Sequence, residues 1–471
     1  MICLILAVLP FLAQDGKVWD DAAMARMEVP PVRSDFTRQR VTAEVYYKRP
    51  VAELFKSYPV YRPDLEPGGY LGLLQAQDPE PLWDAAKLKS DADWIHAGEQ
   101  LFDTPTRFGR IAYAPQDPDL MYLRSKGWFD RVKPPVSFDG TLPNYRYVIR
   151  RKGKIEVGWN ACSMCHSRVM PNGVVEIGPG SQFPFDAAFA EDIRASGRDS
   201  TTVDKNRQLV RAMYFTPWVR SAVFAGLAGY DHQQIALLLD GHPGGTMAID
   251  ATTPWATVKV PDLIGVGALK YLDHTGLHVQ RTPEDLMRYI AAHTVVPDGP
   301  RYGDDQLLAL AMYLVSLKPP KNPNKPNSFT KKGKAVFDRE GCGTCHPAPL
   351  YTNNKLTPAP GFQVPASQKP LYDILPETVG TDPALTLETR RGTGYYRVPA
   401  LTGVWYRGPF GHNGAVAELD QWLDGGRLRN DYFQAGFGGL SGKQGAVKGH
   451  EFGMRMSDQD RAALLAFLRT L

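Results

Sequence analysis

The chain has 471 residues, of which 43% are apolar, and a net charge of +4. This length allows two or three domains with their own cores, and 44 glycines and 39 prolines indicate a globular chain rich in loops. The small net charge and the absence of any basic run longer than three residues argue against a nucleic-acid partner.

The N-terminus contains an apolar stretch from Ile2 to Leu12, which ends before the polar residues 14–16. Such a stretch is too short to span a bilayer and is typical of a secretory signal peptide. We expect residues 1–13 to be removed, and Cys3 with them, although no basic residue precedes the stretch and Phe11 is unusual so close to a cleavage site. No other segment approaches about 18 apolar residues. We therefore expect a periplasmic protein whose mature chain has no membrane span.

Residues 14–90 are interrupted by prolines and predict an N-terminal extension with one or two short helices. A first domain, residues 91–318, opens on a helical pattern that contains Gly98–Asp103. Alternating apolar and polar residues over 145–150 and 154–159 predict a β-hairpin. Pro171-Asn172-Gly173 predicts the turn of a second hairpin. The first domain should therefore be helical with β-hairpin insertions.

Two copies of Cys-x-x-Cys-His, at Cys162–His166 and Cys342–His346, are the most specific motifs of the chain. This spacing is the signature of covalent c-type haem attachment. A zinc site or a redox dithiol is the alternative, because both also use Cys-x-x-Cys. Zinc, however, would need two further ligands from distant histidines. The sequence thus predicts two haem c groups, with thioether bonds from Cys162, Cys165, Cys342 and Cys345 and iron ligands from His166 and His346.

A linker dense in proline and asparagine, residues 319–328, separates the first domain from a second, residues 329–471. The two halves repeat five signals in the same order, which favours a duplicated domain. The first half is larger, since about sixty residues separate Phe102 from Cys162, against five between Phe337 and Cys342. The matched segments are Gly98–Asp103 with Gly333–Asp338, the two Cys-x-x-Cys-His motifs, Val260–Val266 with Val398–Val404, His274–Gly276 with His412–Gly414, and the closing helices Asp304–Leu317 and Asp458–Leu471.

A second axial ligand decides whether a haem only transfers electrons or also reacts with a small molecule. Gly-x-x-aromatic-Gly precedes the closing helix of both halves, with Pro300 in the first and His450 in the second. Proline cannot bind iron, so we predict His450 as a ligand of the second haem and no ligand at this position in the first. His274 and His412 occupy equivalent places and should share a hydrogen-bonding role. The alternatives are Met454, Met456 or His412 at the second haem, and His232, His242, His278 or His293 at the first.

The order of helices and motifs is similar to that of class I cytochrome c domains. We therefore expect a mainly α fold of two tandem class I cytochrome c-like domains, with loop-rich and β-hairpin insertions mostly in the first. Residues Tyr396–Val404 and Gly408–Gly414 resemble a segment of the bacterial di-haem cytochrome c peroxidase superfamily. The resemblance covers residue 90 to the end, and Gly449–Gly453 is closer to the rubber oxygenase branch.

This resemblance implies a di-haem oxidoreductase in which the second haem passes electrons and the first, open haem reacts with peroxide or dioxygen. It also implies a redox partner, either a small cytochrome or a cupredoxin. The catalytic glutamate of the peroxidases has no counterpart that we can place in the first half. An electron-transfer cytochrome with both haems six-coordinate is therefore the alternative. The physiological donor, any organic substrate and the oligomeric state stay open.

Overall fold

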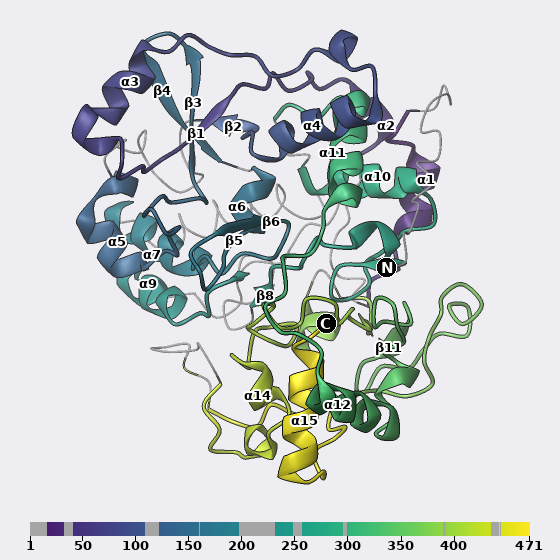
Figure 1. Ribbon diagram of the computed structural model, residues 1–471. Helices are drawn as coiled ribbons and strands as arrows, with labels where there is room; N and C mark the ends of the chain where they lie inside the picture. Colours follow the sequence, from purple (N-terminus) through teal and green to yellow (C-terminus); the bar gives the residue numbers. More distant parts are fainter. Residues whose placement is uncertain are drawn as a thin grey trace.

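The computed structural model describes residues 17–471, except 33–40, 109–121, 160, 197–230, 248–256, 295–298, 390–391, 435–441 and 443. The expected signal peptide lies outside the described residues. The described chain is mainly helical, with one four-stranded sheet and several two-stranded ribbons. The predicted fold class is confirmed. Figure 1 shows the larger first half above and the second half, green to yellow, below, with β8 (Val258–Lys259) at their junction.

Each half is organised around one pair of helices that are distant in sequence. In the first half, α4 (Asp91–Phe102) packs against α11 (Asp304–Ser316). In the second half, α12 (Ser328–Arg339) packs against α15 (Asp458–Leu468). Both pairs are visible in Figure 1. The opening and closing helices of each half therefore meet, as the repeat predicts.

A glycine lies at each helix crossing. A Cβ atom added to Gly98 would clash with the carbonyl oxygen of Ala309, and one added to Gly333 would clash with that of Ala463. Glycine is required at both places because the backbone of the partner helix occupies the space of a side chain. The two crossings are thus built in the same way.

An aromatic pair follows each crossing on the buried side. The ring centroids of Phe102 and Tyr313 lie 5.5 Å apart, and those of Phe337 and Phe467 lie 5.4 Å apart, both edge to face. The core around the first pair contacts Cys162, and the core around the second contacts Cys342. Each haem motif therefore packs against the helix pair of its own half.

The sheet of the first half has the strand order β1-β3-β4-β2. Strands β3 and β4 form the first predicted hairpin, and Gly153 takes the left-handed conformation at its turn (φ 79°). Strands β5 and β6 form the second predicted hairpin, directly after the first haem motif. The bounds are β1 Ser57–Pro59, β2 Arg107–Phe108, β3 Arg146–Arg151, β4 Lys154–Trp159, β5 Ser167–Val169 and β6 Val175–Ile177.

The other described elements are short and connect these parts. None of the described helices is long and apolar enough to cross a membrane. The helices are α1 Asp21–Met27, α2 Ala43–Tyr47, α3 Tyr70–Ala76, α5 Lys126–Val132, α6 Cys162–His166, α7 Phe185–Ser196, α9 His232–Asp240, α10 Pro283–Thr294, α13 Ala384–Glu388 and α14 Leu419–Trp422. The strands are β7 Thr246–Met247, β9 Tyr271–Leu272, β10 His278–Val279, β11 Leu356–Pro358 and β12 Tyr395–Arg397.

The N-terminal extension is part of the fold of the first half. Its strand β1 pairs with β3, and its buried residues Trp19 and Tyr46 belong to the same core as the α4–α11 pair. The extension also pairs with the chain before α11, because Arg301 donates to the carbonyl of Pro50 and accepts from the amide of Ala52. It contains three short helices, α1 to α3, one more than the most that its sequence predicts.

The two halves contact each other through equivalent residues. The amide of Lys259 donates to the carbonyl of His412 (2.9 Å), and the amide of Arg397 donates to the carbonyl of His274 (3.0 Å). In the sequence repeat, Lys259 corresponds to Arg397 and His274 to His412. A reciprocal contact of this kind is what a two-fold relation between similar units produces.

Candidate haem sites

The first haem motif forms the short helix α6. Three hydrogen bonds hold its backbone: Ser181 donates to the carbonyl of Cys165, Gly178 to that of His166, and the Asn144 amide to that of Met164. These bonds lie between 2.8 and 2.9 Å. They fix the motif from one side without using its thiols or its imidazole.

The second haem motif follows α12 directly and begins as a single 3-10 turn, η6 (Cys342–Thr344). Gly341 precedes this turn in the left-handed conformation (φ 74°), which allows the chain to leave the helix sharply. His346 Nδ1 is 2.9 Å from the carbonyl of Tyr351. A histidine that donates through one ring nitrogen presents the other to a metal. His346 thus has the arrangement of an axial ligand.

The repeated Val-Pro segment lies beside the motif histidine in both halves. Burial lowers the pKa values of His166 and His346, and the carbonyls of Pro261 and Pro399 act on them in the opposite direction. His166 Nδ1 makes no hydrogen bond of ordinary geometry, whereas His346 Nδ1 has the Tyr351 carbonyl at 2.9 Å. The Val-Pro repeat is therefore a structural support of the two histidines, which the sequence did not reveal.

The cysteines of the motifs have the environment of thioether sulfurs rather than of thiolates. Burial raises the pKa of the Cys162 thiol to about 12 and also raises the pKa values of Cys342 and Cys345. Zinc binding and dithiol exchange both require the thiolate. Among the described residues, no three His, Cys, Asp or Glu side chains gather as metal ligands. The burial of Cys162, Cys342 and Cys345 is compatible with thioether bonds to a haem.

The imidazole of His450 lies opposite that of His346. Their ring centroids are 6.3 Å apart and their planes are inclined by 59°. A metal–imidazole bond is about 2.0 Å long and the nitrogen lies roughly 1 Å from the ring centroid, so two imidazoles on one ion have centroids about 6 Å apart. The structure thus brings the two predicted histidines of the second haem to the spacing that a shared iron requires.

Aromatic side chains surround His450. Trp422 lies 5.6 Å from its ring and Phe452 5.3 Å. Burial, followed by the neighbouring His346, lowers the pKa of His450 to about 4. Its imidazole is therefore neutral near pH 7, the form that binds a metal.

Arg427 holds the backbone on which His450 lies. This arginine is 1% exposed, and it donates to the carbonyls of Trp422, Val447, Gly449 and His450. His450 itself has a positive φ of 50°, a conformation that is uncommon for a residue with a side chain. The guanidinium of Arg427 thus fixes the backbone of the loop that carries the His450 imidazole.

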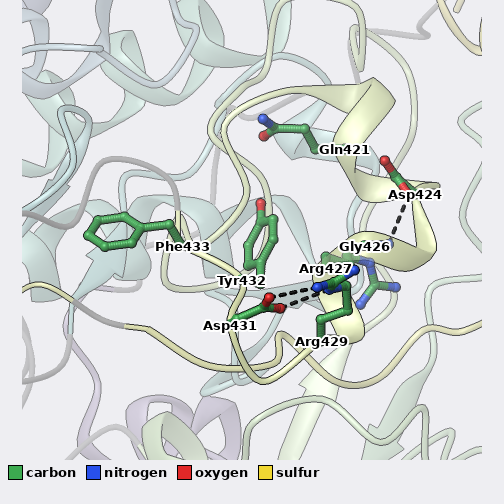
Figure 2. A pocket seen from close by; sticks show the side chains of 8 residues that line it. All are labelled: Gln421, Asp424, Gly426, Arg427, Arg429, Asp431, Tyr432 and Phe433. Carbon is green, nitrogen blue, oxygen red and sulfur yellow. Dashed lines mark hydrogen bonds and ion pairs between the residues drawn. The ribbon is translucent and has the colours of Figure 1, made fainter.

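Figure 2 shows Arg427 at the wall of a surface cavity of about 360 Å³, beside the ion pair of Arg429 and Asp431. The cavity is lined mainly by polar side chains, while Phe433 points away from the others. Arg427 thus lines this cavity and also binds the loop that carries His450.

The other candidates for the second haem have different neighbours. The ring of His412 stacks on Tyr396 with centroids 4.5 Å apart. Met456 packs against the core around α12 and α15, which also contacts Cys342. Met454 is partly buried. Of the two histidine candidates, His450 is the one whose ring lies near that of His346.

The first site is different. Burial, followed by the neighbouring His293, lowers the pKa of His166 to about 3. The ring of His293 lies 3.9 Å from that of Tyr289, tilted by 45°, and its Nδ1 lies 2.8 Å from the Tyr289 carbonyl. The phenol of Tyr302 is buried near Cys162 and has no hydrogen-bond partner among the described residues. In the described part of the chain, the first motif thus has a histidine and a phenol nearby and no ring pair like that of His346 and His450.

The remaining histidines of the first half have other partners. His242 is buried with Nδ1 2.7 Å from the carboxylate of Asp186. The ring of His278 contacts those of His293 and Tyr289. His232 begins α9, and its side chain lies outside the described part of the structure.

The backbones of His274 and His412 share a hydrogen-bonding role, as expected, whereas their rings have different partners. Both accept a backbone hydrogen bond from the other half. His274 Nε2 lies 2.8 Å from the carbonyl of Lys259, whereas the His412 ring contacts Tyr396. Neither imidazole is directed at a motif histidine by any described contact. Both therefore belong to the junction of the halves.

Sequence reasoning missed several residues around the two sites. Arg427, Tyr302, Lys259 and Arg397 have no motif of their own. A signal for the last pair was present, because each stands directly before the repeated Val-Pro. Comparison of the two halves at single-residue level would have found a basic residue at the same place in both.

No protein-family model matches the chain, and no curated protein matches it. Among solved structures, hydrazine synthase from Kuenenia stuttgartiensis is similar over 60% of this chain and 92% of its own, with 13% identity and a TM-score of 0.32. A MauG-like protein associated with microbial copper homeostasis is similar over 45% of this chain and 73% of its own, with 17% identity and a TM-score of 0.30. The diheme peroxidase BthA from Burkholderia thailandensis E264 is similar over 36% of this chain and 51% of its own, with 19% identity and a TM-score of 0.21. We draw no functional conclusion from likenesses this distant.

Proposed function

We propose that the chain is a periplasmic di-haem c-type cytochrome with oxidoreductase activity. Its second haem, on Cys342, Cys345 and His346 with His450 as the second ligand, transfers electrons. Its first haem, on Cys162, Cys165 and His166, reacts with peroxide or dioxygen. The observation that carries this proposal is the pairing of His346 with His450 at 6.3 Å, which has no equivalent around His166 among the described residues.

The chain supplies attachment, orientation and protection from water. Haem iron, when bound, supplies the electron transfer and the reaction with oxygen species. The Tyr351 carbonyl orients His346, and the Arg427-bound backbone orients His450. Two protein ligands leave no position for a substrate, so the second site is suited to electron transfer alone.

In the first half, the place that corresponds to His450 carries Pro300 and is joined to the N-terminal extension. Arg301 pairs with residues 50–52 there. The buried phenol of Tyr302 can donate a hydrogen bond to a molecule near Cys162. This arrangement supports a reactive first haem. A small cytochrome or a cupredoxin would be the redox partner.

Low-temperature EPR of the oxidised protein tests this function. We expect one low-spin and one high-spin haem, and binding of cyanide to the high-spin haem alone. In His450→Ala, the low-spin signal should turn high-spin, because the second haem loses a ligand. Met454→Leu and His412→Gln are the matched controls and should leave the low-spin signal unchanged. An unchanged spectrum in His450→Ala would rule out this ligand.

An electron-transfer cytochrome with both haems six-coordinate is the second candidate. The observation that favours it is His293 on α10, which lies within electrostatic range of His166 and, after burial, is the second cause of the lowered pKa of His166. A native protein with two low-spin haems, one of which becomes high-spin in His293→Ala, would establish this candidate. A covalent haem stain on a denaturing gel tests both candidates, because a chain without haem fits neither.

A further inference from the structure

Basic side chains gather at the junction of the two halves. Lys259, on β8, and Arg168 come from the first half, and Arg397 and Arg407 come from the second. Lys259 lies within electrostatic range of Arg168 and Arg407, and Arg397 lies within that of Arg407. The four cations therefore share one region between the two haem motifs.

Two of these cations have their partners within the protein. Arg168 donates to the carbonyls of Gly180 (3.0 Å) and Gly408 (2.9 Å). Arg407 donates to the carboxylate of Asp262 and to the carbonyl of Ala400, both at 2.9 Å. The Arg168–Gly408 and Arg407–Asp262 contacts join the two halves, and each arginine has at least two of its donors bound within the protein.

The other two cations have donors to spare. None of the described residues accepts a hydrogen bond from the guanidinium of Arg397, and its Nε is buried without a partner. The Lys259 ammonium donates to the carbonyl of Arg407, which leaves two of its three protons. A buried donor without an acceptor costs about 1–3 kcal/mol, and more for a charged group. Such a pair indicates an acceptor that is not among the described residues.

The charge balance of the region indicates that this acceptor is an anion. Asp262 and Asp273 are the carboxylates that act on Lys259 and Arg397, so four cations face two anions. Burial, followed by Arg168 and Arg407, lowers the pKa of Lys259 to about 7. Burial also lowers the pKa of Arg397, in spite of the nearby carboxylates. The described residues by themselves therefore do not fully stabilise the charged forms.

The repeat relates these two cations to the two haem motifs. Lys259 and Arg397 each stand two residues before the proline whose carbonyl acts on the motif histidine, Pro261 in the first half and Pro399 in the second. Each cation is therefore close in sequence to the proline that lies beside a motif histidine, where a haem would be held.

We propose that Lys259 and Arg397 bind the carboxylate groups of the two haems at the junction of the halves. The inference rests on the proposed di-haem function and adds a ligand role for two residues. Haem carries two propionate side chains, and a buried carboxylate is stable when it is paired with a cation and hydrogen-bonded. The two propionate sites then share the network of Arg407 and Asp262, so that the oxidation state of one haem influences the other through a common set of charges.

Removal of either cation should lower the midpoint potential of at least one haem. A positive charge near the iron favours its reduced form, and without it the propionates stabilise the oxidised form. Spectroelectrochemical titration of Lys259→Gln and of Arg397→Gln, each carrying both haems, measures this shift. Resonance Raman spectra of the propionate bending bands give a second readout, because these bands respond to hydrogen bonds on the carboxylates.

Lys270→Gln is the matched control. Lys270 also joins the halves, through an ion pair with Asp373, but its side chain is 41% exposed. The same loss of one charge there should leave both potentials and the propionate bands unchanged. Arg397→Lys should keep the potential close to the native value because it keeps the charge.

Two native haems whose potentials and propionate bands do not respond to Lys259→Gln and Arg397→Gln would overturn this inference and leave the proposed function intact. A native chain without covalent haem would instead overturn the proposed function. If neither variant can be produced, the resonance Raman spectrum of the native protein provides the test. Propionate bands typical of solvated carboxylates would contradict binding by these residues.

Discussion

At the scale of single residues, one buried arginine fixes the loop that carries His450. His450 has a left-handed backbone and lies in a loop without regular structure. Such a loop keeps one conformation only if its backbone groups are satisfied. Arg427 satisfies several carbonyls of this loop at once, and its guanidinium, unlike the ammonium of lysine, is a planar fork with five donors.

Arg427→Ala should lower the free energy of unfolding by about 3 kcal/mol, because it leaves several buried carbonyls without donors. The EPR signal of the second haem should also become heterogeneous, since His450 is no longer held. Urea unfolding followed by circular dichroism, and EPR of the same sample, measure the two effects. Arg429→Ala is the control: its pair with Asp431 is exposed and contributes about 0–1 kcal/mol. Equal effects of both changes would contradict the role of Arg427.

At the scale of elements, the two helix crossings explain why the repeat is visible in the sequence. A close crossing admits only glycine, and the adjacent buried positions take large aromatic rings. Both requirements recur in each half because the geometry recurs. The β-hairpins were predictable for a similar reason, since a turn residue such as Gly153 marks them locally.

Gly333→Ala should destabilise the protein by about 2–3 kcal/mol, because the new methyl group meets the backbone of α15 and overpacks the crossing. Thermal unfolding measures the change. Gly72→Ala in α3 is the matched control: nothing lies within 4 Å of its added Cβ, and alanine should stabilise the exposed helix by about 0.5–1 kcal/mol. A Gly333→Ala protein as stable as the native chain would show that α12 and α15 do not cross so closely.

At the scale of the whole molecule, most of the contacts that the sequence did not predict lie at the junction between the halves. It contains reciprocal backbone bonds, the buried pair of Arg407 and Asp262, and the histidine His274. The backbone bonds and the Arg407–Asp262 pair join the two halves, whereas the His274 ring bonds the Lys259 carbonyl within the first half. The junction therefore links the folding of the two halves as well as their haem motifs.

The stability of this junction should fall in acid. Burial, followed by Arg397, lowers the pKa of His274 from 6.5 to about 3. Between these pH values the unfolded chain binds the proton more tightly than the folded chain does. The contribution of His274 to the free energy of unfolding is therefore complete above about pH 6.5. It is lost as the pH falls toward 3, by at most about 1.4 kcal/mol per pH unit. Urea unfolding from pH 7 to pH 4 measures this slope, and His274→Gln should reduce it. A slope unaffected by that change would contradict this assignment.

Local patterns made much of the fold predictable. Apolar helix patterns, turn glycines and the haem motifs depend on residues close in sequence. Because the pattern recurs in both halves, each half supports the interpretation of the other. The extension was less predictable, because β1 exists only through its pairing with β3 and Tyr46 is buried only by the first-half core. Long-range contacts of this kind leave little trace in the order of the residues.

The sequence by itself predicts the attachment chemistry, because Cys-x-x-Cys-His is a local motif of five residues. It also predicts the duplication and identifies His450 as the candidate distal ligand. Only the tertiary structure decided that the ring of His450 lies near that of His346 and that Lys259 and Arg397 both lie at the junction of the halves. The reason is physical: a pair distance between remote residues depends on how α12, α15 and the two halves pack, and packing is a property of the whole chain.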